Sequence, residues 1–283
     1  MHIKHQWGVV VGAMALGFTL AFAAPKPAAV HAQSYSRYAT VTKKGYVMWS
    51  SLRFNHRKTN TTNYYHQTLR VKARYRHGRS QYLSLYNRYG HWLGYVNARA
   101  VKVTTSKQGV AIGAHHYVSL TRAYPIWNNF GFHSVRHWAK NYYARTYLVK
   151  AQYHHFNGSW YNSMYDHSGR WFGYLSATGA KTTSAQGIGV ATNRYVQVTA
   201  SRYTQWQSFA FNRGYTMNGS GNHPLFAAKR IYYHYNGSTY YSLYTAAAWA
   251  GYINTSATRT VSSTTYANQA RYFATVDNNK VAL

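Results

Sequence analysis

Acidic residues are almost absent from this chain of 283 residues, which has 32 lysines and arginines against two aspartates. The formal net charge near neutral pH is +30. Solvated protein faces normally mix both signs of charge, and this chain lacks one of them. Like-charge repulsion at this density disfavours a compact state unless polyanions or counterions lie close by. We therefore expect the missing negative charge to belong to a partner.

Cysteine is absent as well, which excludes disulfides and a cysteine nucleophile. A chain of this length can bury hydrophobic cores without disulfide bonds. Long apolar runs are absent after residue 24. No later segment approaches the length of a membrane span, so the rest of the sequence does not indicate an integral membrane protein.

The first 32 residues have the features of a secretory signal peptide. A basic start at Lys4 precedes an apolar run over residues 7–24, and Val30 and Ala32 form a V-x-A cleavage site. The alternative is an uncleaved anchor, but 18 residues is short for a span and glycines dilute the hydrophobicity. Removal of residues 1–32 would leave 30 cations, two acids and 13 of the 16 histidines, a formal charge of +28.

A repeat with a period of 78 to 79 residues organises the remainder of the chain. Its first mark is the tryptophan of YVMW, YPIW and YTQW, at Trp49, Trp127 and Trp206. A second mark is the tryptophan of HWLGY, RWFGY and AWAGY, at Trp92, Trp171 and Trp249. The third is the last tyrosine of YLSLY, YNSMY and YYSLY, at Tyr86, Tyr165 and Tyr244. We predict modules at 33–108, 109–187 and 188–266, then an incomplete fourth unit or a closing strand at 267–283.

Each unit has the composition of a β-domain. Tyrosine, threonine, valine, isoleucine and tryptophan dominate, and turn signals recur every eight to twelve residues. Asn157-Gly158 and Asn236-Gly237 are strong signals for two-residue hairpin loops. The prediction is an all-β chain, with one small β-barrel in each unit and short ordered links between units.

The repeat resembles the GW modules of Gram-positive surface proteins. The matching features are the period, the basic charge, the signal peptide and a glycine-aromatic pair before an apolar strand: Gly94-Tyr95, Gly173-Tyr174 and Gly251-Tyr252. The Gly-Trp pair that gives GW modules their name is Gly-Tyr here, and a tryptophan stands two residues before each glycine. The resemblance implies SH3-like barrels that bind lipoteichoic acid noncovalently, and in some family members host glycosaminoglycans.

Catalysis is not expected. Only Asp166 lies inside a complete unit, so paired carboxylates are excluded, and a Ser-His-acid triad would need one of the two aspartates. A zinc site of three histidines is conceivable, and two adjacent pairs stand out. Neighbouring strand residues point to opposite faces, so neither pair would chelate together. We expect surface histidines, no metal and no cofactor at His115, His116, His154 and His155.

The stretch RVKARYRHGR, residues 70–79, places basic residues on alternate positions. Alternate strand residues share a face at a spacing of about 6.6 Å. A row of cations on one face is therefore predicted, with Arg79 after it: Arg70, Lys72, Arg74 and Arg76. A lysine also recurs at the aligned positions of the three units: Lys72, Lys150 and Lys229.

Aromatic residues divide into two expected groups. The tryptophans at the unit starts, Trp49, Trp127 and Trp206, are predicted to be barrel core. The 31 tyrosines are too many to bury, so some are expected to form platforms on which sugar faces stack. The candidate platform residues flank the glycine turns: Trp92, Tyr95, Trp171, Tyr174, Trp249 and Tyr252.

These features predict an exported, non-catalytic protein of the Gram-positive cell wall, held to anionic lipoteichoic or teichoic acid by many weak contacts. One alternative is an adhesin for sulfated host polysaccharides, which make the same demand on arginine, and another is peptidoglycan binding. Nucleic acid would also suit the charge, but it is a less favoured partner because the chain carries an export signal and no recognised nucleic-acid motif. A second hypothesis is that attachment tightens as pH falls through about 6, where histidines gain charge.

Overall fold

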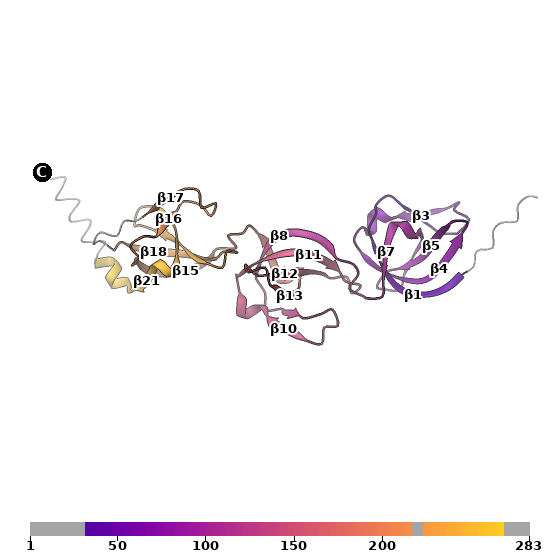
Figure 1. The fold of residues 1–283 in the computed structure, drawn as a ribbon, viewed down its shortest axis with the longest axis horizontal. Coiled ribbons are helices and arrows are strands. Elements are labelled where there is room, and N and C mark those ends of the chain that lie inside the picture. The colour runs from indigo at the N-terminus through magenta and orange to yellow at the C-terminus, as the bar shows by residue number, and fades with distance from the viewer. Residues whose placement is uncertain (1–31, 217–222, 269–283) are drawn as a thin grey trace, which may run out of the picture.

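The computed structural model describes residues 32–216 and 223–268. The predicted signal peptide, apart from Ala32, and residues 269–283 of the predicted closing segment lie outside the described residues. The prediction of an all-β tandem is confirmed, because the described chain forms three seven-stranded antiparallel sheets. Figure 1 shows them following one another along the molecule. No helix in the described ranges is long and apolar enough to cross a membrane.

The first module has the strand order β3-β2-β6-β5-β4-β1-β7. Single-turn 3₁₀ helices at Thr61–Tyr64 and Ala98–Ala100 connect β3 to β4 and β6 to β7. Its strands are β1 (Ala32–Val41), β2 (Val47–Trp49), β3 (Arg57–Asn60), β4 (Thr68–His77), β5 (Ser80–Tyr86), β6 (Trp92–Asn97) and β7 (Val101–Thr104).

The second and third modules repeat this order strand for strand. The second comprises β8 (Ile112–Leu120), β9 (Pro125–Trp127), β10 (Val135–Trp138), β11 (Thr146–His154), β12 (Trp160–Tyr165), β13 (Trp171–Ser176) and β14 (Ala180–Thr183), with 3₁₀ turns at Ala139–Tyr142 and Ala177–Gly179. The third comprises β15 (Val190–Val198), β16 (Thr204–Trp206), β17 (Gly214–Thr216), β18 (Leu225–Tyr233), β19 (Thr239–Tyr244), β20 (Trp249–Asn254) and β21 (Thr258–Val261), with a 3₁₀ turn at Thr255–Ala257. A helical segment at 263–268 follows β21.

Each module has its own apolar core, formed by alternate residues of its strands. In the second module Ile126, Val149, Met164 and Leu175 are completely buried. Burial of one such side chain contributes about 1.5–3 kcal/mol to folding. Because the cores are separate, each module has the internal packing of a small domain.

The tryptophans at the unit starts do not belong to these cores, so that prediction is wrong. Trp49, Trp127 and Trp206 are half-buried. The residue before each tryptophan points inward, as Met48 and Ile126 do, and strand alternation sends the indole to the opposite face. Each indole packs edge-on against a phenylalanine five residues later, with ring centroids 5.3 to 5.6 Å apart.

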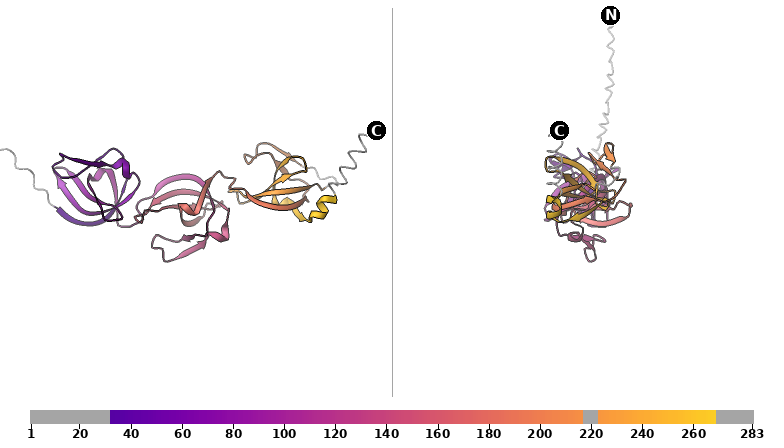
Figure 2. Two further views of the ribbon diagram at one scale, coloured as in Figure 1. Left: turned by 180° about the vertical axis from the view of Figure 1, so that it is seen from behind. Right: turned by 90° about the vertical axis from the view of Figure 1, so that its left-hand side faces the viewer.

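The modules meet through matching contacts. The amide of Phe156 donates to the carbonyl of Lys107 in the preceding link, and the amide of Tyr235 donates to Ala185, each at 2.8 Å. Tyr38 packs against Phe156 at 5.0 Å, and Tyr117 against Tyr235 at 4.8 Å. Hairpins of one module thus dock on the preceding module in the same way at both junctions (Figures 1 and 2).

Candidate ligand-binding surfaces

The predicted row of four cations is not formed, because β4 carries a β-bulge. In the ladder between β4 and β5, Arg70 pairs with Tyr86, but the register shifts between Val71 and Ala73. Beyond the shift Arg74 pairs with Leu83, a core residue. Paired residues share a face, so Arg74 and Arg76 lie on the face opposite Arg70.

The extra residue of that bulge is Lys72, and the same bulge occurs at Lys150 and Lys229. The three predicted lysines therefore occupy one structural position, and all three are exposed. Each ammonium lies over the ring of a tyrosine on the neighbouring strand, at 4.2, 4.4 and 4.3 Å from the centroid. The tyrosines are the third mark of the repeat: Tyr86, Tyr165 and Tyr244.

The predicted platform tryptophans stand beside these lysine–tyrosine pairs. Trp92 pairs with Tyr86 across β5 and β6, and its indole N–H donates to Ser84 at 3.0 Å. Trp171 and Trp249 make the equivalent bonds to Ser163 and Ser242. The indole N–H is therefore already satisfied within the module and is not a free donor.

A tyrosine completes each cluster. Tyr95, Tyr174 and Tyr252 meet the tryptophan edge-on at 5.1 to 5.3 Å. Burial, together with neighbouring tyrosines, raises the pKa of Tyr174 to about 12. We call each cluster a lysine–aromatic site: Lys72, Tyr86, Trp92 and Tyr95; Lys150, Tyr165, Trp171 and Tyr174; Lys229, Tyr244, Trp249 and Tyr252.

The three sites differ in a second cation. Lys58 lies 4.6 Å over the Trp92 ring, and the Arg136 guanidinium lies 5.0 Å over Trp171. Lys58 and Arg136 lie on β3 and β10. The equivalent strand of the third module, β17, pairs with β16 without a bulge, and among the described residues no cation covers Trp249. Its side chain is 41% exposed, so the third site has the barest aromatic surface.

The glycine of each Gly-Tyr pair has a structural role. Gly94, Gly173 and Gly251 have φ values of +125°, +136° and +127°, which L side chains rarely adopt. A Cβ on Gly94 would lie 2.9 Å from the carbonyl oxygen of Trp49. The glycine therefore allows close approach of two strands, and the adjacent tyrosine is thereby fixed beside the tryptophan.

Arg70 pairs with Tyr86 of the first lysine–aromatic site, whereas Arg74, Arg76 and Arg79 lie apart from it. The Arg74 guanidinium sits 4.9 Å over the Tyr35 ring and bonds to the Gln33 side chain. The Arg76 Nε donates weakly to the carbonyl of Gly78 at 3.4 Å, and Arg79 is exposed in the hairpin turn. These residues form a separate basic patch on the first module.

The prediction that His155 is a surface histidine is wrong. Its ring is 5% exposed and packs among Phe130, Phe132 and Tyr161. Its Nδ1 accepts the amide of Asn157 at 3.0 Å. Nδ1 of His154 accepts the amide of Thr68 in the first module at 3.2 Å. His115 is exposed, as predicted, and His116 is half-buried.

Burial weakens the hypothesis that all histidines charge near pH 6. It lowers the pKa of several rings below the ordinary value, so these rings gain charge at a lower pH than exposed histidines do. The affected residues are His66, His116, His137, His154, His155 and His234.

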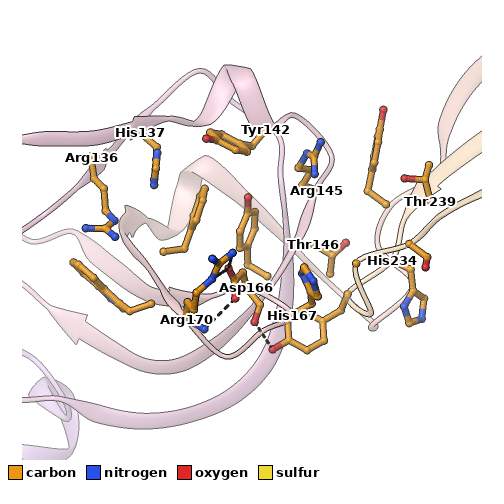
Figure 3. Close-up of a pocket in the computed structure, with 17 residues that line it drawn as sticks. Arg136, His137, Tyr142, Arg145, Thr146, Asp166, His167, Arg170, His234 and Thr239 are labelled. Atoms are coloured by element: carbon orange, nitrogen blue, oxygen red, sulfur yellow. Dashed lines mark hydrogen bonds and ion pairs between the residues drawn. The ribbon is translucent and has the colours of Figure 1, made fainter.

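Sequence reasoning did not find a cleft of about 470 Å³ between the second and third modules (Figure 3). Three arginines and three histidines line it, together with aromatic rings: Arg136, Arg145, Arg170, His137, His167, His234, Phe172 and Tyr233.

Asp166 also lines the cleft, and its carboxylate already has hydrogen-bond and ion-pair partners within the second module. Its carboxylate accepts the amides of Ser168 and Arg170 and pairs with the Arg170 guanidinium at 3.0 Å. Burial acts to raise the pKa of Asp166, but these bonds hold it below the usual range.

No protein-family model and no curated protein matches this chain. Among solved structures it is similar to a Listeria monocytogenes chain provisionally assigned as an autolysin. The sequence identity is 12% and the TM-score 0.26, with 80% of this chain and 97% of the other covered. A similarity at this level carries no argument about function.

Proposed function

We propose that this chain is a non-catalytic protein of the bacterial cell surface that attaches noncovalently to anionic wall polymers such as lipoteichoic or teichoic acid. Each lysine–aromatic site offers an exposed ammonium to a phosphate and a ring face to the sugar or polyol beside it. The predicted signal peptide and the resemblance to GW modules support an exported location on a Gram-positive wall.

The observation that carries this proposal is the recurrence of one bulged lysine over one tyrosine in all three modules. The neighbouring residues vary: the strands read RVKARY, LVKAQY and AAKRIY. A lysine needed only for solubility would not require a bulge that places it on a ring. In the described part of the chain the sole salt bridge joins Asp166 and Arg170, so none of these lysines has a carboxylate partner.

Three linked sites give strong attachment from weak contacts. An exposed ionic contact contributes about 1 kcal/mol or less. Once one site has bound a polymer, the others face a high effective concentration of its repeating units. The docked junctions restrict how far the sites move relative to one another, which reduces the entropy lost when the second and third sites bind.

The test is binding of the chain without its predicted signal peptide to Gram-positive cells, with and without lipoteichoic acid, across a salt series. The expected result is loss of binding without the polymer and steep weakening with salt. Binding that persists without any anionic wall polymer, and is insensitive to salt, would overturn the proposal in favour of peptidoglycan recognition by the aromatic faces. Equal competition by heparin and by lipoteichoic acid would instead favour the sulfated-polysaccharide alternative.

A further inference from the structure

The two module junctions have the same architecture, yet only some of their residues match. The amides of Gln67 and Arg145 donate to the equivalent carbonyls of Tyr64 and Tyr142, so Arg145 takes the place of Gln67. Trp160 pairs with His154 where Thr239 pairs with Tyr233, so Thr239 takes the place of Trp160. The second junction thus has an additional arginine and a much smaller hairpin residue.

These exchanges explain why the second junction is open. At the first junction the Trp160 ring packs against His154 and faces His66 at 6.4 Å. Arg88 also crosses the first junction and donates to the carbonyl of Asn157 at 2.6 Å. At the second junction Thr239 leaves space where the indole would be, and the shorter His167 stands in place of Arg88.

The charge within the cleft is positive and incompletely balanced. Asp166 neutralises Arg170. Arg145 enters no side-chain hydrogen bond in the described part of the chain, and its guanidinium lies 5.7 Å from the Tyr233 centroid. The Arg136 guanidinium bonds to Asn128 at 3.1 Å while covering Trp171. Two arginines thus remain without a counter-charge at the cleft (Figure 3).

A stack of aromatic rings also lines the cleft. The Phe172 ring is nearly parallel to His137 at 4.4 Å and to Tyr147 at 4.3 Å. Guanidinium groups recognise phosphate through paired N–H donors, and flat rings pack against the C–H face of a sugar or polyol. The volume falls in the range of small-molecule sites.

We propose that the cleft between the second and third modules is a dedicated site for one phosphate-bearing sugar or polyol unit. Arg145, which has no side-chain hydrogen bond among the described residues, binds the phosphate, and the aromatic rings that line the cleft contact the carbon skeleton. This deepens the proposed function, since the unit is the repeating element of a phosphodiester wall polymer, and Arg136 and Trp171 join the cleft to the second lysine–aromatic site.

The test uses glycerol phosphate and hexose phosphate as probes, with glycerol and hexose as uncharged controls. Binding is followed by calorimetry and by backbone amide shifts in the full chain without its predicted signal peptide. Arg145→Gln installs the residue of the first junction, and Thr239→Trp fills the cleft without changing its charge. Arg99→Gln, at an exposed position of the first module, is the charge-matched control.

The expected result is saturable shifting of amides at residues 237–239, a loss of affinity of about tenfold or more in Arg145→Gln, and no binding in Thr239→Trp. Arg99→Gln should bind like the unaltered chain. Equal small losses in Arg145→Gln and Arg99→Gln, or unchanged binding in Thr239→Trp, would overturn the inference. Unchanged amide spectra elsewhere confirm that each variant is folded.

The two proposals fail in different ways. If Thr239→Trp and the unaltered chain bind lipoteichoic acid equally and neither binds the probes, the cleft inference falls while the proposed function stands. If the probes bind in the cleft but the polymer does not bind, the cleft inference stands and the proposed function falls.

Discussion

The ammonium of Lys150 lies 4.4 Å from the centroid of the Tyr165 ring on the adjacent strand. A bulge in β11 creates this relationship, since it places the lysine out of the regular ladder. The ring attracts the ammonium from one side, and the opposite side of the ammonium stays exposed to solvent. A lysine held in this way is pre-positioned for an anion and loses less side-chain entropy when it binds.

Removal of the three bulged lysines should weaken attachment to the polymer and reduce its salt dependence. The triple variant Lys72→Gln, Lys150→Gln and Lys229→Gln loses about 0.5–1 kcal/mol per contact, which amounts to tenfold or more in affinity. Affinity for purified lipoteichoic acid is measured at several salt concentrations. The matched control replaces three exposed lysines elsewhere, Lys43, Lys102 and Lys181. An equal loss in both triples would show that net charge, rather than the sites, governs binding.

Replacement of Gly94 by alanine should destabilise the first module. Its φ of +125° and the Trp49 carbonyl 2.9 Å from a new Cβ both oppose the substitution. The expected cost is about 1–3 kcal/mol, measured by thermal or denaturant unfolding. Gly113→Ala is the control, because nothing lies within 4 Å of a Cβ there. Equal stability of the two variants would contradict the structural role of the Gly-Tyr glycine.

Acid should destabilise the second module through His155. Its Nδ1 accepts the Asn157 amide, so protonation there removes that bond, and burial lowers the pKa of the ring in the folded state. The unfolded chain then binds more protons below about pH 6.5, so the free energy of unfolding falls as pH decreases toward the folded-state pKa and is fully restored above 6.5. The slope is at most about 1.4 kcal/mol per pH unit for this histidine.

The measurement is the unfolding free energy of the chain between pH 5 and 7.5, compared with His155→Asn. Asparagine retains an acceptor for the Asn157 amide but does not titrate. The variant is expected to be less stable at pH 7.5 because of the lost ring, with a shallower dependence on pH. An unchanged pH slope would exclude His155 as the titrating group.

Tyr266 should act as a cap on the third module. It stacks on Tyr195 at 4.5 Å, the position at which Tyr38 and Tyr117 receive the rings of the next module. Tyr266→Ala should cost about 0.5–1.5 kcal/mol, observed as faster amide exchange in β15 and a lower melting temperature for this module. Tyr215→Ala, at a 70% exposed ring, is the control and should have no effect.

Much of the fold follows from the sequence because a pattern that repeats along the chain produces the same strands and the same packing in each module. The period of the tryptophans and tyrosines, the alternation of apolar residues and the Asn-Gly turns all predict a β tandem, and the structure confirms it. The aligned lysines Lys72, Lys150 and Lys229 were visible for the same reason. The modules share one backbone, so equal positions in sequence become equal positions in space.

What the sequence could not decide depends on register and on contacts between modules. Strict alternation places Arg70 and Arg74 on one face, but one extra residue at Lys72 reverses every side chain beyond it. The unit-start tryptophans leave the core because their neighbours Met48 and Ile126 fill it. The cleft joins Arg145 to Thr239, residues nearly a hundred positions apart, and only docking of the third module's hairpin on the second brings them together. Local patterns thus determine the strands, whereas pairing and docking determine which side chains meet.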